Sequence, residues 1–151
     1  MRAYLTLRVP PLLLLALALA LQGWLAPSQA ARGVWQWLLA LALLGLSGGV
    51  ALAAAFAFRR ARTTVDPRQP HSSSALLTHG VYAWTRNPMY LAFAGILLAQ
   101  TVYLGWPLGL LWVMAFIWYL TEFQIKPEEA ALTERFGAAY EAYLRRVRRW
   151  C

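Results

Sequence analysis

The sequence has few charged residues and few candidate metal ligands. Asp, Glu, Lys and Arg make up only 13% of the 151 residues, and hydrophobic residues make up 60%. In average soluble domains, charged residues make up about 25% and hydrophobic residues about 45–50%. The single cysteine, Cys151, excludes an internal disulfide and a cysteine-based metal cluster, and His71 and His79 lack a metal-ligand spacing. We therefore expect no bound metal and no soluble core.

Four apolar runs predict an all-α integral membrane protein. A hydrocarbon core of about 30 Å needs roughly 20 apolar residues per helix, and the runs cover residues 9–26, 34–58, 89–105 and 106–125. No segment is left over for a second core, so we expect one membrane domain over residues 1–151. A cleaved signal peptide is the alternative for residues 1–30, because Arg2 and Arg8 precede the first run and Ser28-Gln29-Ala30 resembles a cleavage site.

The net charge of +8 indicates membrane topology more than a nucleic-acid partner. With a cytoplasmic N-terminus, 13 of the 14 basic residues lie inside and only Arg32 lies outside. This bias predicts cytoplasmic termini and a cytoplasmic loop over residues 59–88. Basic residues interleaved with exposed aromatics, as on a nucleic-acid-binding face, are not seen. The expected partner is a lipid bilayer, and the short loops are compatible with a bacterial inner membrane.

After Pro127 the apolar residues recur at spacings of three and four. This pattern predicts an amphipathic helix over residues 128–147. The basic stretch from Arg145 to Trp150 forms the C-terminal end of this segment. We expect this helix to lie on the cytoplasmic leaflet, with its arginines among anionic headgroups.

The segment from Thr78 to Tyr90 is unusually polar for the entrance of an apolar helix. Gly80 permits a turn, and Pro88 pushes Asn87 out of the α region and can open the next helix. Backbone donors at that helix start suit an anionic group, and Arg86 adds a fixed positive charge. A snorkelling arginine and an aromatic belt explain Arg86 and Tyr90, but not the glycine, asparagine and proline together. The residues alone leave both interpretations open.

Three acidic residues flank the end of the last apolar run. Glu128 and Glu129 complement the dipole of a helix that starts near Pro127. Neighbours on a helix point about 100° apart, so the two cannot face one ligand equally. Glu122 is either a functional group or an ion-pair partner for Arg86 or the loop arginines.

Two segments resemble the signatures of the isoprenylcysteine carboxyl methyltransferases. Residues 74–90 are similar to the cofactor motif of that family, and residues 128–143 resemble its C-terminal signature. The wider group includes phospholipid N-methyltransferases and small-thiol methyltransferases. The resemblance implies S-adenosylmethionine as methyl donor on the cytoplasmic side, with these cofactor contacts: Ser74, Ala75, Leu76, Leu77, Tyr82, Asn87, Pro88, Met89, Tyr90 and Glu128. We predict Glu128 and Arg86 as the catalytic pair and Tyr82 and Tyr90 as pocket walls.

The acceptor is less well specified by the resemblance. The family often has histidine where Ser74 and Asn87 stand, and the eukaryotic enzymes carry a substrate-contacting arginine where this chain has Gln124. We assign Gln124 to substrate binding and expect a lipophilic or lipidated acceptor that enters from the lipid side. The expected activity is isoprenylcysteine-carboxylate-like, with a phospholipid amine or a small thiol as alternative acceptors. A non-enzymatic helical membrane protein is the rival class.

Overall fold

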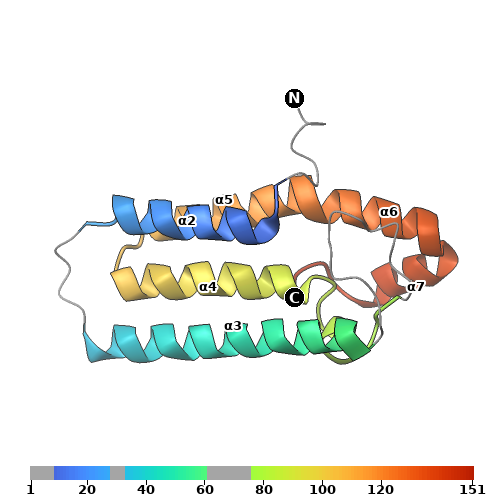
Figure 1. The fold of residues 1–151 in the computed structure, drawn as a ribbon, viewed down its shortest axis with the longest axis horizontal. Coiled ribbons are helices and arrows are strands. Elements are labelled where there is room, and N and C mark those ends of the chain that lie inside the picture. The colour runs from blue at the N-terminus through green and yellow to red at the C-terminus, as the bar shows by residue number, and fades with distance from the viewer. Residues whose placement is uncertain (1–8, 28–32, 61–75) are drawn as a thin grey trace.

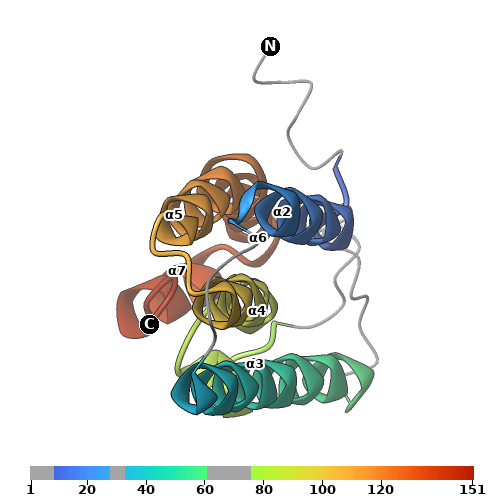
Figure 2. The same cartoon turned by 90° about the vertical axis from the view of Figure 1, so that its left-hand side faces the viewer.

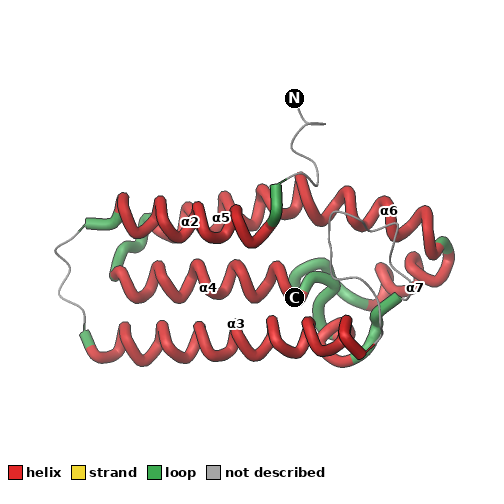
Figure 3. Tube along the Cα trace, in the orientation of Figure 1, coloured by secondary structure: helices red, strands yellow, loops and turns green. Residues whose placement is uncertain are grey.

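The computed structural model describes residues 9–27, 33–60 and 76–151 (Figure 1). Two of the predicted cofactor contacts, Ser74 and Ala75, lie outside these residues. Within the described ranges every regular element is helical, and none is a strand (Figure 3). The elements are α2 (Pro11–Leu25), α3 (Val34–Arg60), the 3₁₀ turn η2 (Gly80–Ala83), α4 (Pro88–Leu104), α5 (Gly109–Leu120), the π turn η3 (Thr121–Ile125), α6 (Lys126–Phe136) and α7 (Ala138–Arg146). The predicted all-α class is confirmed.

Helix α4 is the centre of the bundle. It packs against α2, α3 and α5, which run alongside it (Figures 1 and 2). Leu97 of α4 is fully buried and joins Leu15 of α2 and Leu120 of α5 in the main hydrophobic cluster. Small residues allow close approach of helices, and a Cβ at Gly95 of α4 would collide with the Ser47 side chain of α3.

The outer surface of the bundle is apolar. Leucines, tryptophans and Met114 on α2, α3 and α5 are exposed, which is unusual for a soluble monomer. Helix α3, with 27 residues, is the one described helix that is long and apolar enough to cross a membrane. Helices α2 and α4 are apolar but have 15 and 17 residues, so they fall short of the roughly 20 residues that a straight span needs.

The helix after α5 differs from the sequence expectation. We expected a span that ends at residue 125 and a separate helix over residues 128–147. Instead α5 continues through η3 into α6. Pro127 lacks an N–H and its ring would clash with the carbonyl of Phe123 in a regular α-helix. The π turn, which ends two residues before Pro127, widens the helix near that point.

The chain reverses at Gly137, and α7 returns beside α6. Gly137 has φ +50°, a conformation that favours glycine. The apolar face of α7 does not lie on a leaflet as we expected. Tyr140, Tyr143 and Val147 are buried against Leu76 and Phe136 in a second hydrophobic cluster. The amphipathic pattern of α7 therefore arises from packing against the rest of the protein. Helix α7 covers the segment that precedes α4.

Candidate functional site

The polar segment before α4 forms a compact turn. Gly80, with φ +62°, opens η2, and Thr85 Oγ1 accepts a hydrogen bond of 3.1 Å from the Asn87 backbone N–H. Pro88 occupies the first turn of α4, as its missing N–H favours. The Asn87 side chain does not point toward open space, because its Nδ2 donates to the carbonyl of Arg149 at 2.9 Å. The structure thus gives Asn87 a structural partner.

Tyr90 and Glu128 link the two sequence signatures. The Tyr90 hydroxyl donates to Glu128 Oε1, across 38 positions of sequence. Tyr90 is buried; Glu128 keeps some exposed surface, but its carboxyl group is surrounded by protein. Burial raises the pKa of Glu128 to about 8; the Tyr90 hydrogen bond lowers this pKa and the charge of Glu129 raises it. Within the described part of the chain this carboxyl group has no cationic partner, and such a group suits a positively charged ligand.

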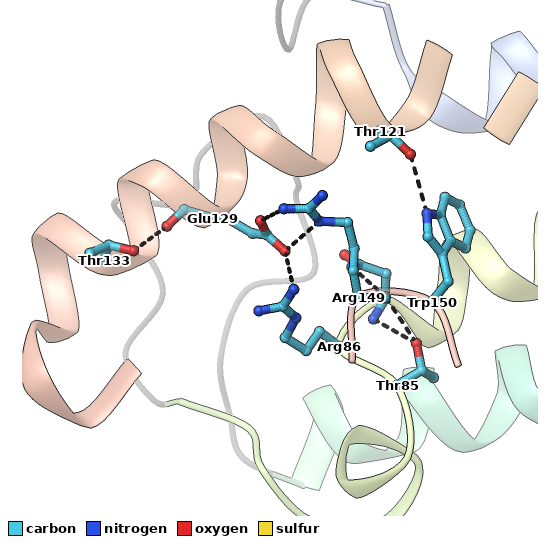
Figure 4. Close-up of polar contacts among 8 residues, drawn as sticks. Thr85, Arg86, Thr121, Glu129, Thr133, Arg149 and Trp150 are labelled. Atoms are coloured by element: carbon cyan, nitrogen blue, oxygen red, sulfur yellow. Dashed lines mark hydrogen bonds and ion pairs between the residues drawn. The ribbon is translucent and has the colours of Figure 1, made fainter. Parts of the chain in front are cut away.

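Glu129 points elsewhere, as the helical geometry predicts, and binds two arginines (Figure 4). Arg149 donates to it through Nε at 3.1 Å and Nη2 at 2.7 Å. Arg86 Nη2 lies 3.1 Å from Glu129 Oε1. The Arg86 Nε atom is buried and has no hydrogen-bond partner among the described residues. Arg86 therefore compensates Glu129, the neighbour of the predicted glutamate, and keeps one donor available.

Residues 147–150, which we call the strap, pass between the start of α4 and the α5–α6 helix. The carbonyl of Arg148 accepts a 3.0 Å hydrogen bond from the Arg86 backbone N–H. Trp150 Nε1 donates to Thr121 Oγ1 at 3.2 Å, and its ring packs on the main cluster. From the sequence we expected Arg149 and Trp150 to lie among lipid headgroups, so their role in the strap was missed. The basic run gives no sequence signal that singles out Arg149.

Three tyrosines surround the same region. Burial raises the pKa of Tyr82 and of Tyr140 above the ordinary value, and raises that of Tyr143 to about 12. All three hydroxyl groups stay protonated at neutral pH. The Tyr143 hydroxyl donates to the Tyr82 carbonyl at 2.7 Å, which fixes α7 over η2.

The other predicted residues differ in burial and in the side chains that they contact. Leu76 packs in the second cluster, and Leu77 and Met89 are partly buried. Gln124 is fully buried in the π turn, and its Nε2 donates to the Val9 carbonyl at 3.0 Å.

Glu122 pairs with Lys126 one turn later. Of the two alternatives for Glu122, the structure supports an ion pair, and the partner that it shows is Lys126. Among the described residues, no group of three or more His, Cys, Asp or Glu could hold a metal ion.

Comparison with known proteins identifies the family. Residues 35–139 match the phospholipid methyltransferase family, which covers well over half of the chain. The chain belongs to this family of methyltransferases.

Three curated relatives match parts of the chain. An uncharacterized protein of Haemophilus influenzae is 47% identical over 62 residues, which are 41% of this chain and 98% of that protein. The protein-S-isoprenylcysteine O-methyltransferase of Saccharomyces cerevisiae is 34% identical over 76 residues, 50% of this chain and 32% of the enzyme. The Schizosaccharomyces pombe enzyme of the same name is 35% identical over 72 residues, 48% and 30% of the two chains. The chain thus spans about a third of the length of the two yeast enzymes. No solved structure matches.

Proposed function

We propose that this protein transfers a methyl group from S-adenosylmethionine to a lipophilic acceptor at the cytoplasmic face of a membrane. The observation that carries the proposal is the contact between Tyr90 and Glu128. It joins the two segments that resemble methyltransferase signatures, and a purely structural helical bundle does not need a buried carboxyl group there. Membership of a methyltransferase family supports the same conclusion.

The side chains at this site fit the chemistry of the donor. S-adenosylmethionine carries an ammonium group, a carboxylate and a sulfonium, and it supplies the activated methyl group. The Glu128 carboxylate would hold the ammonium group or the ribose hydroxyls. The unpartnered Arg86 Nε would bind the carboxylate, and the rings of Tyr82 and Tyr90 would face the positive charge. Among the remaining predicted contacts, the partly buried Leu76, Leu77 and Met89 would supply apolar surface.

No covalent enzyme intermediate is needed for this chemistry. The chain would contribute by holding donor and acceptor in line and by excluding water. The burial of Tyr82 and Tyr90 supports water exclusion.

We further propose that α2, α3, α4 and the α5–η3 helix lie in the bilayer as four spans. Exposed leucines on three of these helices support a lipid environment. The described basic residues lie at the end of α3, just before α4 and in the segments after α5. These three parts of the chain are together at one end of the bundle (Figure 1). Following the positive-inside rule, we propose that the site and both termini face the cytoplasm, and that the host membrane is a bacterial inner membrane. Short spans are accommodated by local thinning of the bilayer.

Gln124 bears on the choice of acceptor. It stands where the resemblance places a substrate-contacting arginine, but here it is enclosed and bonded to the Val9 carbonyl. A carboxylate acceptor would meet no guanidinium from this position. We propose an acceptor that enters from the lipid side, with a prenylcysteine-like carboxylate, a phospholipid amine and a small thiol as the three chemical classes to test.

Binding of the donor is the first test. Isothermal titration of the detergent-purified protein with S-adenosylhomocysteine should show saturable binding, and Glu128→Ala and Tyr90→Ala should weaken it. Glu134→Ala, on the exposed side of α6, is the matched control. A wild-type protein that does not bind S-adenosylhomocysteine would favour the non-enzymatic class. Unchanged affinity in both site variants would refute the site assignment.

Labelling identifies the acceptor class. Membranes that contain the protein are incubated with methyl-labelled donor, and the product is then treated with base. A methyl ester of a carboxylate releases the label as methanol, whereas an N-methyl or S-methyl product retains it.

A further inference from the structure

The strap connects both halves of the proposed donor site through a single residue. The Arg149 side chain binds Glu129 of α6 at two points. The Arg149 carbonyl accepts hydrogen bonds from Asn87 Nδ2 at 2.9 Å and from Thr85 Oγ1 at 3.3 Å, both at the start of α4. Tyr90, on α4, meets Glu128, on α6, beside this connection. The position of Glu128 relative to Tyr90 therefore depends on the strap.

We propose that Arg149 is a positioning residue: it holds α6 against the start of α4 and occupies Glu129, so that Glu128 alone receives the positively charged donor. The proposal rests on the proposed function and adds a residue that neither sequence signature contains. Arg149 acts through Glu129 and through the strap, and we assign it no contact with the donor.

The electrostatics favour this division between the two glutamates. The Glu129 side chain is only 13% exposed, and two guanidinium groups compensate its charge. An uncompensated carboxylate next to Glu128 would oppose ionisation of Glu128. The arginine fork matches a carboxylate at two points, which a lysine cannot reproduce. Arg149 thus keeps Glu128 easier to ionise, and so easier to pair with a cation.

Anchoring to lipid headgroups is the competing role for this basic segment. Arg145, Arg146 and Arg148 have exposed side chains that are available for such a role. Arg148 is adjacent to Arg149, and its contact with the described part of the site is through its backbone carbonyl. It is therefore a matched control, because a change of its side chain removes the same charge from the same segment.

The test measures the affinity for S-adenosylhomocysteine by isothermal titration between pH 6 and 9. Among the described residues, the titratable and charged groups around Glu128 are Tyr90 of α4, Tyr82 of η2, Tyr140 of α7, and Glu129 of α6 with Arg86 and Arg149. Arg149→Gln should lower the affinity about tenfold at pH 7 and move the pH midpoint of binding upward by about one unit, because one pKa unit corresponds to a tenfold change. Arg149→Lys should recover part of both effects, and Arg148→Gln should change neither.

A second background separates positioning from simple loss of packing. If Arg149 acts through Glu129, Arg149→Gln should cause no further pH shift in a Glu129→Gln protein, because the charge that it compensates is gone. A wild-type protein that binds, together with an Arg149→Gln variant with the same affinity and pH midpoint, overturns the role of Arg149 and leaves the proposed function in place. A lower affinity with no change of midpoint also overturns it. A wild-type protein that does not bind removes both proposals.

Discussion

Replacement of Glu128 by glutamine should weaken donor binding and also stabilise the free protein at alkaline pH. Glutamine keeps an acceptor for the Tyr90 hydroxyl and has no charge to bury. In the folded protein the pKa of Glu128 rises from an ordinary 4.5 to about 8, because the carboxyl group is desolvated. The folded state therefore keeps, between these two pH values, a proton that the unfolded chain has lost. Wild-type stability must fall as pH rises through this window.

The size of the effect follows from the shift. About 3.5 pKa units at 1.36 kcal/mol each set a ceiling of roughly 5 kcal/mol, reached above pH 8. Below the ordinary pKa the carboxyl group is protonated in both states. Wild type and Glu128→Gln should then be about equally stable.

Unfolding followed in detergent from pH 4 to pH 9 provides the assay. The wild-type and Glu128→Gln curves should coincide at the acid end and separate as pH rises, with the variant the more stable by a few kcal/mol at pH 9. Glu134→Gln, which alters an exposed carboxylate on the same helix, should follow the wild type. A Glu128→Gln variant no more stable than wild type at pH 9 would refute the desolvation of this carboxyl group.

Three further predictions concern binding and packing. Affinity for S-adenosylhomocysteine should rise up to about tenfold per pH unit toward pH 8 and then level off, because its ammonium group needs ionised Glu128; a flat titration profile contradicts this. Tyr90→Phe removes the hydrogen bond that lowers the pKa of Glu128, so the plateau should begin at higher pH in the same titration. Gly109→Ala should lower the unfolding free energy by about 1–3 kcal/mol, because the new Cβ would lie 2.5 Å from Gln22 Nε2. Gly45→Ala, with nothing within 4 Å of its Cβ, is the control, and equal loss in both variants would refute the packing argument.

The locations of the four apolar helices follow from the sequence because hydrophobicity is a local property. The run predicted at 34–58 became α3 (Val34–Arg60), and the run at 89–105 became α4 (Pro88–Leu104). The path after α5 was not predictable in the same way. Pro127 normally indicates the end of a helix, but here the helix continues past it through a π turn. The reversal at Gly137 depends on a positive φ, and the sequence pattern alone does not specify this conformation.

The two glutamates show how far the site could be predicted. Their divergence follows from the 100° between helix neighbours, and it is seen in the separate partners of Glu128 and Glu129. The identity of those partners could not be predicted. Arg149 reaches Glu129 only because the chain reverses at Gly137 before α7. Four other residues between 145 and 150 are also basic or aromatic, so nothing in the sequence distinguishes Arg149 from them. Long-range ion pairs depend on the tertiary path, which a single sequence does not specify.

The π turn decides which carboxylate faces Tyr90. A five-residue π turn winds by about 90° less than an α-helix of the same length. With a regular helix over residues 121–125, Pro127 would therefore take the angular position of Glu128, and Glu128 would take that of Glu129. The two arginines would then compensate Glu128, and Tyr90 would meet a proline. Pro127 favours the π turn because it cannot donate to Phe123. The residue that is expected to break the helix therefore leaves Glu128 without a guanidinium partner among the described residues, as the proposed binding of a cationic donor requires.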